Sequence, residues 1–318
     1  MRPTDLVRPL ARALPTAAQT RLRELRAAGR VAAAASDFVS APRAFARAAV
    51  APRRRVLCTP GSVRPGRLLS KLFAVNGYRP VFDPDRAHDF SVRVPARGGR
   101  PTFNGRHRDN KKSRVAAAWA AAAGYPLAVD PTVHSGPMVE KSEANATHDG
   151  RVVDGPIRAE EVREGKVYQA LVDNSDGDEV VDLRVALYRG HVPLVYVKRR
   201  PVHDRFSNSN TSVSIGEPTD LFSAEELQAL ARFAWAVGLD YGEADVLRDN
   251  ASVRIYVVDS TNGPAGPPNG LPPSSAREAV ARLAAAFDVA VDAAIEGGPR
   301  WAPDPDQPGA GPSPASPL

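Results

Sequence analysis

The chain has 318 residues, with 42 Lys and Arg against 36 Asp and Glu, a formal net charge of +6 and 43% hydrophobic residues. This composition is typical of a soluble globular protein with one large or two ordinary domains. The single Cys58 excludes an internal disulfide framework and a multi-cysteine zinc site, and no apolar run approaches the roughly 18 residues of a membrane span.

Residues 1–55 form a basic extension that accounts for the positive charge. They hold twelve Arg and three acidic residues, a local balance of +9, so that residues 56–318 are net acidic. Leucines at spacings near three and four favour an amphipathic helix within this extension. We interpret it as a solvated basic helical arm, with an organellar transit peptide as the alternative.

The segment after the extension predicts a small α/β lobe over residues 56–104. Residues 56–58 predict a strand, residues 68–75 a helix and residues 80–82 a second strand. A strand, a glycine-containing turn, a helix and a strand in this order indicate parallel pairing of the two strands.

The rest of the chain predicts an α+β body and a structureless tail. Expected helices cover 113–123, 224–237 and 274–296, and expected strands cover 167–172, 180–187, 192–197, 244–247 and 253–258. Ser223 and Glu226 match a capping box at the start of the second helix. The Pro-rich residues 297–318 have almost no large apolar side chains, so we expect this tail to be disordered.

Two lysine-containing segments of the body are suited to binding polyphosphate. Lys111 and Lys112 stand just before a predicted helix, where backbone N–H groups and the helix dipole attract anions. Lys141 ends an apolar run and precedes a small-residue loop that contains His148 and ends at Gly150. Such a loop can close over phosphates while the ammonium acts as a point charge. A solvated turn is the simpler alternative for the first segment. In the second, we interpret His148 and Asp149 as loop residues, with a catalytic pair as the alternative.

Two further segments complete the pattern. Residues 168–172 predict a buried strand that leads into an acidic turn, and such a strand can line an adenine pocket. Asp245 and Asp259 lie on the two strands of a predicted hairpin, so their carboxylates can meet at one edge of the sheet. Facing carboxylates repel and share a proton or a cation, and Mg²⁺ prefers one or two carboxylates together with phosphate oxygens. Alternatively, the two aspartates only cap turns.

Taken in order, these segments resemble the ATP-grasp family over roughly residues 105–296. The motifs that carry the resemblance are Arg-Asp-Asn-Lys-Lys-Ser, Val-Glu-Lys-Ser, Gly-Glu-Ala-Asp-Val-Leu and Tyr-Val-Val-Asp-Ser-Thr-Asn-Gly-Pro-Ala-Gly. The resemblance implies a mixed α/β and α+β fold in which two lobes hold ATP between antiparallel sheets. A hinge is then expected near residues 168–173, and residues 56–104 are similar to the Rossmann-like lobe that precedes this fold.

The resemblance also implies roles for individual residues. It implies nucleotide contacts for Lys112 (or Lys111), Lys141, His148, Gly150, Gln169 and Leu171, magnesium ligation for Asp245, Asp259 and Asn262, and stabilisation of the transferred group by Arg184, Lys198 and Arg199. The chain departs from the family at one point. The family usually ends the second strand of the hairpin with Glu-x-Asn, whereas strict register here gives Asp259-x-Thr261, so that either Thr261 or Asn262 completes the metal site.

The implied activity is an ATP- and Mg²⁺-dependent ligase that joins a carboxylate to an amine or similar nucleophile through an acyl-phosphate. A kinase on the same scaffold and a non-catalytic ATP-binding module are the alternatives. The expected partners are small-molecule or peptide carboxylates and amines. Nucleic acid is not expected because the body is net acidic, and a homo-oligomer is compatible with the sequence. We expect a cytoplasmic protein, or an organellar one if residues 1–55 are a transit peptide.

Overall fold

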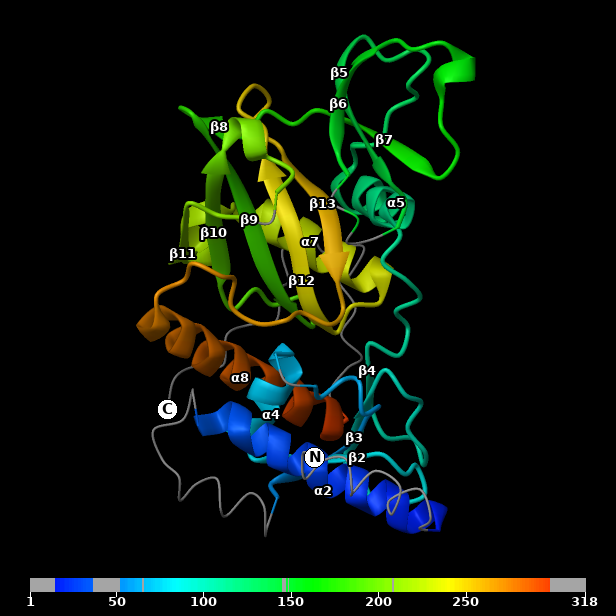
Figure 1. Cartoon of the computed structure of the whole chain (residues 1–318), viewed down its shortest axis with the longest axis vertical. Helices are drawn as coiled ribbons and strands as arrows, with labels where there is room; N and C mark the ends of the chain where they lie inside the picture. The colour runs from blue at the N-terminus through cyan, green and yellow to red at the C-terminus, as the bar shows by residue number, and fades with distance from the viewer. Residues whose placement is uncertain are drawn as a thin grey trace, which may run out of the picture.

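A computed structural model describes residues 15–36, 52–64, 66–144, 147, 149–207 and 209–297. The predictions for the tail beyond residue 297, for His148 and for the first leucines of the extension fall outside these residues. Three sheets and the helices that cover them confirm the mixed α/β and α+β class (Figure 1). Within the described ranges, no helix is long and apolar enough to cross a membrane.

The N-terminal lobe is a small parallel sheet, as predicted. Its strands have the order β2-β1-β3-β4 and comprise β1 (Arg54–Leu57), β2 (Tyr78–Val81), β3 (Phe90–Val92) and β4 (Thr102–Phe103). The predicted helix is α4 (Leu68–Asn76), which ends at Gly77 with φ 69°, where the left-handed backbone lets the Gly77 N–H bond to the Phe73 carbonyl. The chain therefore runs from β1 through α4 to a parallel β2.

Helix α8 (Pro273–Ile295) lies far along the chain but completes this lobe. It packs against α4 and also contacts β9 and β11 of the large sheet, and Figure 1 shows it between the two. Phe287 is fully buried at its centre, with its ring 6.2 Å from Phe90 and 5.5 Å from Tyr241. The N-terminal lobe and the large sheet therefore share one hydrophobic core.

Helix α2 (Thr16–Ser36) confirms that the extension is helical, but it is not the solvated arm that we expected. It packs against α4 and β2. Ala27 is buried, and the Glu24 carboxylate, only 1% exposed, accepts a hydrogen bond from the Phe82 N–H at 2.9 Å and one from the Arg86 guanidinium. The buried Glu24 therefore helps to hold the basic helix α2 against the N-terminal lobe. The net charge of the extension does not reveal this contact.

We expect Glu24→Ala to destabilise the protein by about 1–3 kcal/mol, because the substitution leaves the Phe82 N–H without its acceptor. The measurement is the urea midpoint of unfolding followed by circular dichroism. Arg23→Ala, which changes an exposed residue of the same helix, is the control and should shift the midpoint little. Equal midpoints for the Glu24 variant and the wild type would show that α2 docks by apolar contacts alone.

The body contains two antiparallel sheets. The small sheet has the order β6-β5-β7 and the large one runs β11-β10-β9-β12-β13, with β8 beside β9. The elements are α5 (Lys112–Ala123), β5 (Gly136–Ser142), β6 (Arg151–Gly155), η1 (Ala159–Glu161), β7 (Lys166–Ala170), β8 (Ser175–Asp176), β9 (Glu179–Tyr188), β10 (Val195–Pro201), η2 (Val202–Asp204), β11 (Ser212–Gly216), α6 (Pro218–Leu221), α7 (Ala224–Val237), β12 (Tyr241–Arg248) and β13 (Ile255–Thr261). The predicted hairpins and the capping box at Ser223 are present.

The two faces of the large sheet differ in chemistry. On β9, Leu183, Val185 and Leu187 join a core formed with α5 and α7, in which the Trp119 and Phe233 rings lie 6.3 Å apart. Because side chains alternate along a strand, the even-numbered residues of β9 face the other way. Asp182 and Arg184 there line a cavity, whereas Ala186 and Tyr188 continue into the core beneath α8.

Candidate functional site

A cavity of about 550 Å³ lies between the small and large sheets. Its charged lining consists of six basic and five acidic side chains: Lys112, Lys141, Arg184, Lys198, Arg200, Arg205, Asp149, Asp182, Glu243, Asp245 and Asp259. These residues come from α5, from two of the three sheets and from the loops between them. Concentrated charge of both signs is typical of a site that binds a polyanion together with a cation.

A β-bulge brings the two predicted aspartates together. Asp245 on β12 pairs directly with Asp259 on β13, whereas the next pair is Val246 with Val257, so Val258 is the extra residue. If β13 paired regularly, Val258 would lie opposite Asp245, and the alternation of side chains would place Asp259 on the opposite face of the sheet. The bulge also places Thr261, and not Asn262, in the lining of the cavity.

Asp245 is held ionised by fixed cations. Its Oδ1 accepts from Arg184 Nε at 3.0 Å and from Lys198 Nζ at 3.2 Å, and its Oδ2 accepts from Arg184 Nη2 at 3.0 Å. Burial opposes ionisation, but the charges of Arg184 and Lys198 outweigh it and hold the pKa of Asp245 well below its usual range. Burial raises the pKa of Asp259, against the opposing charge of Lys112, and the negative charge of Asp245 raises it further.

The unused lone pairs of these carboxylates fit a divalent cation that also binds phosphate oxygens or water. A carboxylate has about four lone-pair sites; three on Asp245 are taken, which leaves one on Oδ2. Among the described residues, Asp259 accepts a hydrogen bond from the Ser260 N–H at 2.8 Å, and its Oδ2 lies 3.9 Å from Lys112 Nζ. In the described part of the chain, no three His, Cys, Asp or Glu residues cluster as a complete metal site, so phosphate oxygens and water would complete the shell.

The two predicted lysines stand beside Asp259. Lys112 is 6% exposed at the start of α5 and donates to the Ala144 carbonyl at 3.0 Å. Lys141 donates to the Val258 carbonyl at 3.1 Å. Burial lowers the pKa of Lys141 to about 8, despite the attraction of Asp259. Lys111 is exposed and outside the cavity lining, so the structure favours Lys112 of the two alternatives.

On β10, the alternation of side chains decides which basic residue reaches the cavity. Lys198 and Arg200 line it, and Arg200 donates to Asp182 at 2.6 Å. Arg199, which the resemblance pointed to, lies on the other face and donates to Asp176 at 2.7 Å. Because side chains alternate along a strand, Arg200 and not Arg199 shares the cavity face with Lys198.

The remaining predicted residues divide between the cavity and its surroundings. Gly150 lines the cavity, and a Cβ atom there would lie 2.7 Å from the Phe206 ring, so only glycine allows this contact between the loop after β5 and the loop after β10. Gln169 is buried within β7, and neither it nor Leu171 is among the lining residues. Asn262 also lies outside the lining, and its carbonyl accepts from Asn104.

Glu243 is a lining residue that the sequence reasoning did not single out. It is 2% exposed, and its Oε2 lies 3.8 Å from Arg184 Nε. Burial raises the pKa of Glu243 to about 7; the charge of Arg184 opposes this rise and that of Asp245 adds to it. Burial and then the charge of Glu243 raise the pKa values of Tyr188 and Tyr196. The only signal in the sequence was its position two residues before Asp245.

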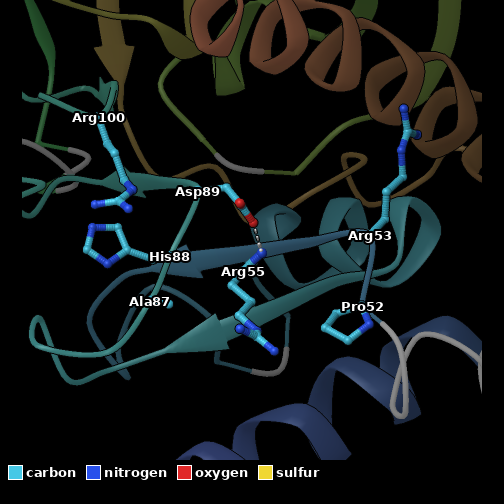
Figure 2. A pocket seen from close by; sticks show the side chains of 7 residues that line it. All are labelled: Pro52, Arg53, Arg55, Ala87, His88, Asp89 and Arg100. Carbon is cyan, nitrogen blue, oxygen red and sulfur yellow. Dashed lines mark hydrogen bonds between the residues drawn. The ribbon is translucent and has the colours of Figure 1, made fainter. Parts of the chain in front are cut away.

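A second cavity, of about 320 Å³, lies on the N-terminal lobe (Figure 2). Its basic side chains do not converge: Figure 2 shows those of Arg53 and Arg55 pointing in different directions. Arg53 pairs with Asp288 of α8 at 2.5 Å, and Asp89 accepts from the Arg55 backbone N–H at 2.6 Å. The cavity between the sheets is therefore the stronger candidate for a functional site.

No protein-family model and no curated protein matches the chain. Among solved structures, the ATP-grasp ligase PsnB complexed with a minimal precursor is similar over 74% of this chain and 98% of its own, at 14% identity and a TM-score of 0.48. D-alanine–D-alanine ligase from Bacillus anthracis is similar over 77% and 98%, at 11% identity and 0.42. D-cycloserine synthetase DcsG is similar over 74% and 99%, at 15% identity and 0.43.

The solved structures similar to this chain thus include an ATP-grasp ligase, the class that its sequence resembles.

Proposed function

We propose that this chain is an ATP-grasp enzyme, a ligase that uses ATP and Mg²⁺ to join a carboxylate to an amine or similar nucleophile through an acyl-phosphate. One observation carries the proposal. One cavity between antiparallel sheets is lined by Lys112 of α5, by Lys141 of the small sheet and by two facing aspartates of the large sheet. A nucleotide triphosphate with its cation matches this arrangement of charge.

The fixed charges of the cavity have separate tasks in this proposal. Lys112 and Lys141 bind phosphate oxygens, while Arg184 and Lys198 stabilise the charge that develops on the transferred group. Phosphoryl transfer needs positioning and electrostatic stabilisation more than it needs a side-chain nucleophile. Arg184 and Lys198 are already oriented by Asp245, so they need little reorganisation during the reaction.

Asp245 and Asp259 would hold Mg²⁺, which would screen the phosphate charge and orient the terminal phosphate. Thr261 lies on the same face of β13 and opposite Glu243, so we propose Thr261 in place of Asn262 as the third polar group at this edge. Gly150, near the end of the loop after β5, lies close to Phe206, and both residues line the cavity. A loop in this place excludes water, which would otherwise hydrolyse the acyl-phosphate.

Thermal unfolding with a non-hydrolysable ATP analogue and Mg²⁺ tests the nucleotide site. Ligand at about 100 times its dissociation constant should add roughly 2.7 kcal/mol to the free energy of unfolding. Lys112→Met should lose most of this gain, because it removes a buried ammonium from the cavity. Lys111→Met is the matched control, since it removes an exposed lysine next in sequence, and it should respond like the wild type.

Equal stabilisation of both variants would contradict the assignment of Lys112, and no stabilisation of the wild type would contradict the nucleotide site. The reaction is tested separately with mixtures of carboxylates and amines. Phosphate release that requires both a carboxylate and an amine identifies a ligase. A stable phosphoester product would instead identify a kinase on the same scaffold.

A further inference from the structure

The cavity has a buried inner end, which the nucleotide assignment does not use. On this face of the large sheet, Glu243 of β12 pairs with Ala186 of β9, next to the pair formed by Asp245 and Arg184. Tyr188 follows on β9, and Tyr196 of β10 pairs with Arg184. Glu243, Tyr188 and Tyr196 therefore lie around the small side chain of Ala186 on one face of the sheet, and Glu243 also lines the cavity.

Each of these three residues has a buried oxygen atom without a partner. Glu243 Oε1 and the hydroxyl oxygens of Tyr188 and Tyr196 make no hydrogen bond within the described part of the chain. All three side chains are almost fully buried. Buried polar atoms are nearly always satisfied, and each unsatisfied one costs free energy. Three in one place indicate a group that binds there.

The charge balance indicates the chemistry of that group. Arg184 is the nearest cation to Glu243, at 3.8 Å, but its Nε and Nη2 already donate to Asp245. The charges of Lys198 and Lys71 act on Glu243 less strongly than that of Arg184. Within the described part of the chain, Glu243 Oε1 accepts no hydrogen bond, charged or neutral. A primary ammonium has three N–H donors and a positive charge, which match one carboxylate oxygen and two hydroxyl oxygens.

We propose that Glu243, with Tyr188 and Tyr196, binds the acceptor substrate by its primary amine, so that the acceptor enters as an ammonium. This inference rests on the proposed ligase function and names the class of its nucleophile. Glu243 lies two residues before Asp245 on the same face of β12. An amine held there stands beside the site where the carboxylate would be activated. A lysine side chain, a peptide amino terminus and a free amino acid all present this group.

The test uses the full chain with the ATP analogue and Mg²⁺ bound, and methylammonium chloride as the probe. Ligand-observed NMR should detect methylammonium bound to the wild type, while tetramethylammonium, which has no N–H group, should not bind. Glu243→Gln keeps the shape but removes the charge and should weaken methylammonium binding at least tenfold. Tyr196→Phe should weaken it about threefold to tenfold, as expected for one lost hydrogen bond. Glu160→Gln makes the same change at an exposed residue and should have no effect.

Stability gives a second readout that a merely structural role would not share. If Glu243 awaits a ligand, Glu243→Gln should unfold at the same temperature as the wild type or higher, because it replaces a buried carboxylate whose Oε1 has no hydrogen-bond donor among the described residues. A lower unfolding temperature would show that Glu243 serves the fold through Arg184 and would overturn the inference. Equal methylammonium binding by the wild type and Glu243→Gln would overturn it too, as would no binding by the wild type. Stabilisation by the nucleotide reports on the proposed function separately in every variant.

Discussion

Asp259→Asn is expected to lower kcat by at least about 100-fold, the usual cost of removing a group that stabilises charge in a transition state. Asp245 gives most of its lone pairs to Arg184 and Lys198, whereas within the described part of the chain the Asp259 carboxylate accepts one hydrogen bond. An amide in its place is a weaker and neutral ligand. The dependence on magnesium should change with it, so that half-maximal activity needs a much higher Mg²⁺ concentration.

The thermal stability of the two variants should differ, because folding shifts the pKa values of the two aspartates in opposite directions. The pKa of Asp259 is raised in the folded state, so its ionised form opposes folding at neutral pH and Asp259→Asn should preserve or increase stability. The pKa of Asp245 is lowered, so its charge contributes stability above the unfolded pKa, and this contribution is lost as pH falls. Asp245→Asn should therefore destabilise the protein, because it leaves Arg184 and Lys198 unpaired.

The measurements are steady-state kinetics over a magnesium titration and thermal unfolding of each variant. Asp176→Asn is the control, since this exposed carboxylate pairs with Arg199 outside the cavity. If Asp259→Asn kept its rate and its magnesium dependence, Asp259 would be no metal ligand. If both variants were equally destabilised, the pair would be a structural feature of the hairpin.

The parts of the fold that sequence predicted are those fixed by local chemistry. The glycine after α4, the capping box at Ser223 and the apolar runs of β9 and β10 act within a few residues of chain. The packing of α8 on the N-terminal lobe depends on contacts between residues some 200 positions apart, such as Phe90 and Phe287. No local pattern specifies such a contact, although the apolar spacing did identify the helix.

The site was predictable in its residue types and less so in its geometry. Asp245 and Asp259 could be identified from strand ends, but the bulge at Val258 decides that they share a face and that Thr261 joins them. Asn262 was considered because the family usually has an asparagine at this point, but β13 is regular after the bulge, so Thr261 and not Asn262 shares the face of Asp259. Glu243 was missed because its importance arises from burial, which a glutamate in a strand does not reveal.

The affinity for nucleotide should fall as pH rises above about 8, because Lys141 then loses its proton in the free protein. Burial lowers the pKa of Lys141 to about 8, whereas a bound triphosphate would keep the ammonium charged. Binding then takes up a proton, and the dissociation constant should rise by up to about tenfold for each pH unit. The terminal phosphate has a second pKa near about 6, so it does not titrate in this range.

The same pKa shift predicts the opposite trend for the protein without nucleotide. The depressed pKa means that the unfolded chain binds more protons than the folded one between about pH 8 and the unperturbed value of about 10.4. The contribution of Lys141 to stability therefore rises with pH across this window. Alkaline conditions should therefore weaken nucleotide binding, while the contribution of Lys141 to the free energy of unfolding does not fall.

The two trends are measured by calorimetric titration of the ATP analogue and by urea unfolding, each from pH 7.5 to 9.5. Lys141→Arg is the matched variant, because a guanidinium stays charged throughout the range and should remove the slope whatever its effect on affinity. Lys141→Met should bind weakly and also without slope. A wild-type slope that persists in both variants would assign the titration to another group. A flat wild-type profile would mean that Lys141 remains charged at pH 9.5 and is less buried than its contact with the Val258 carbonyl implies.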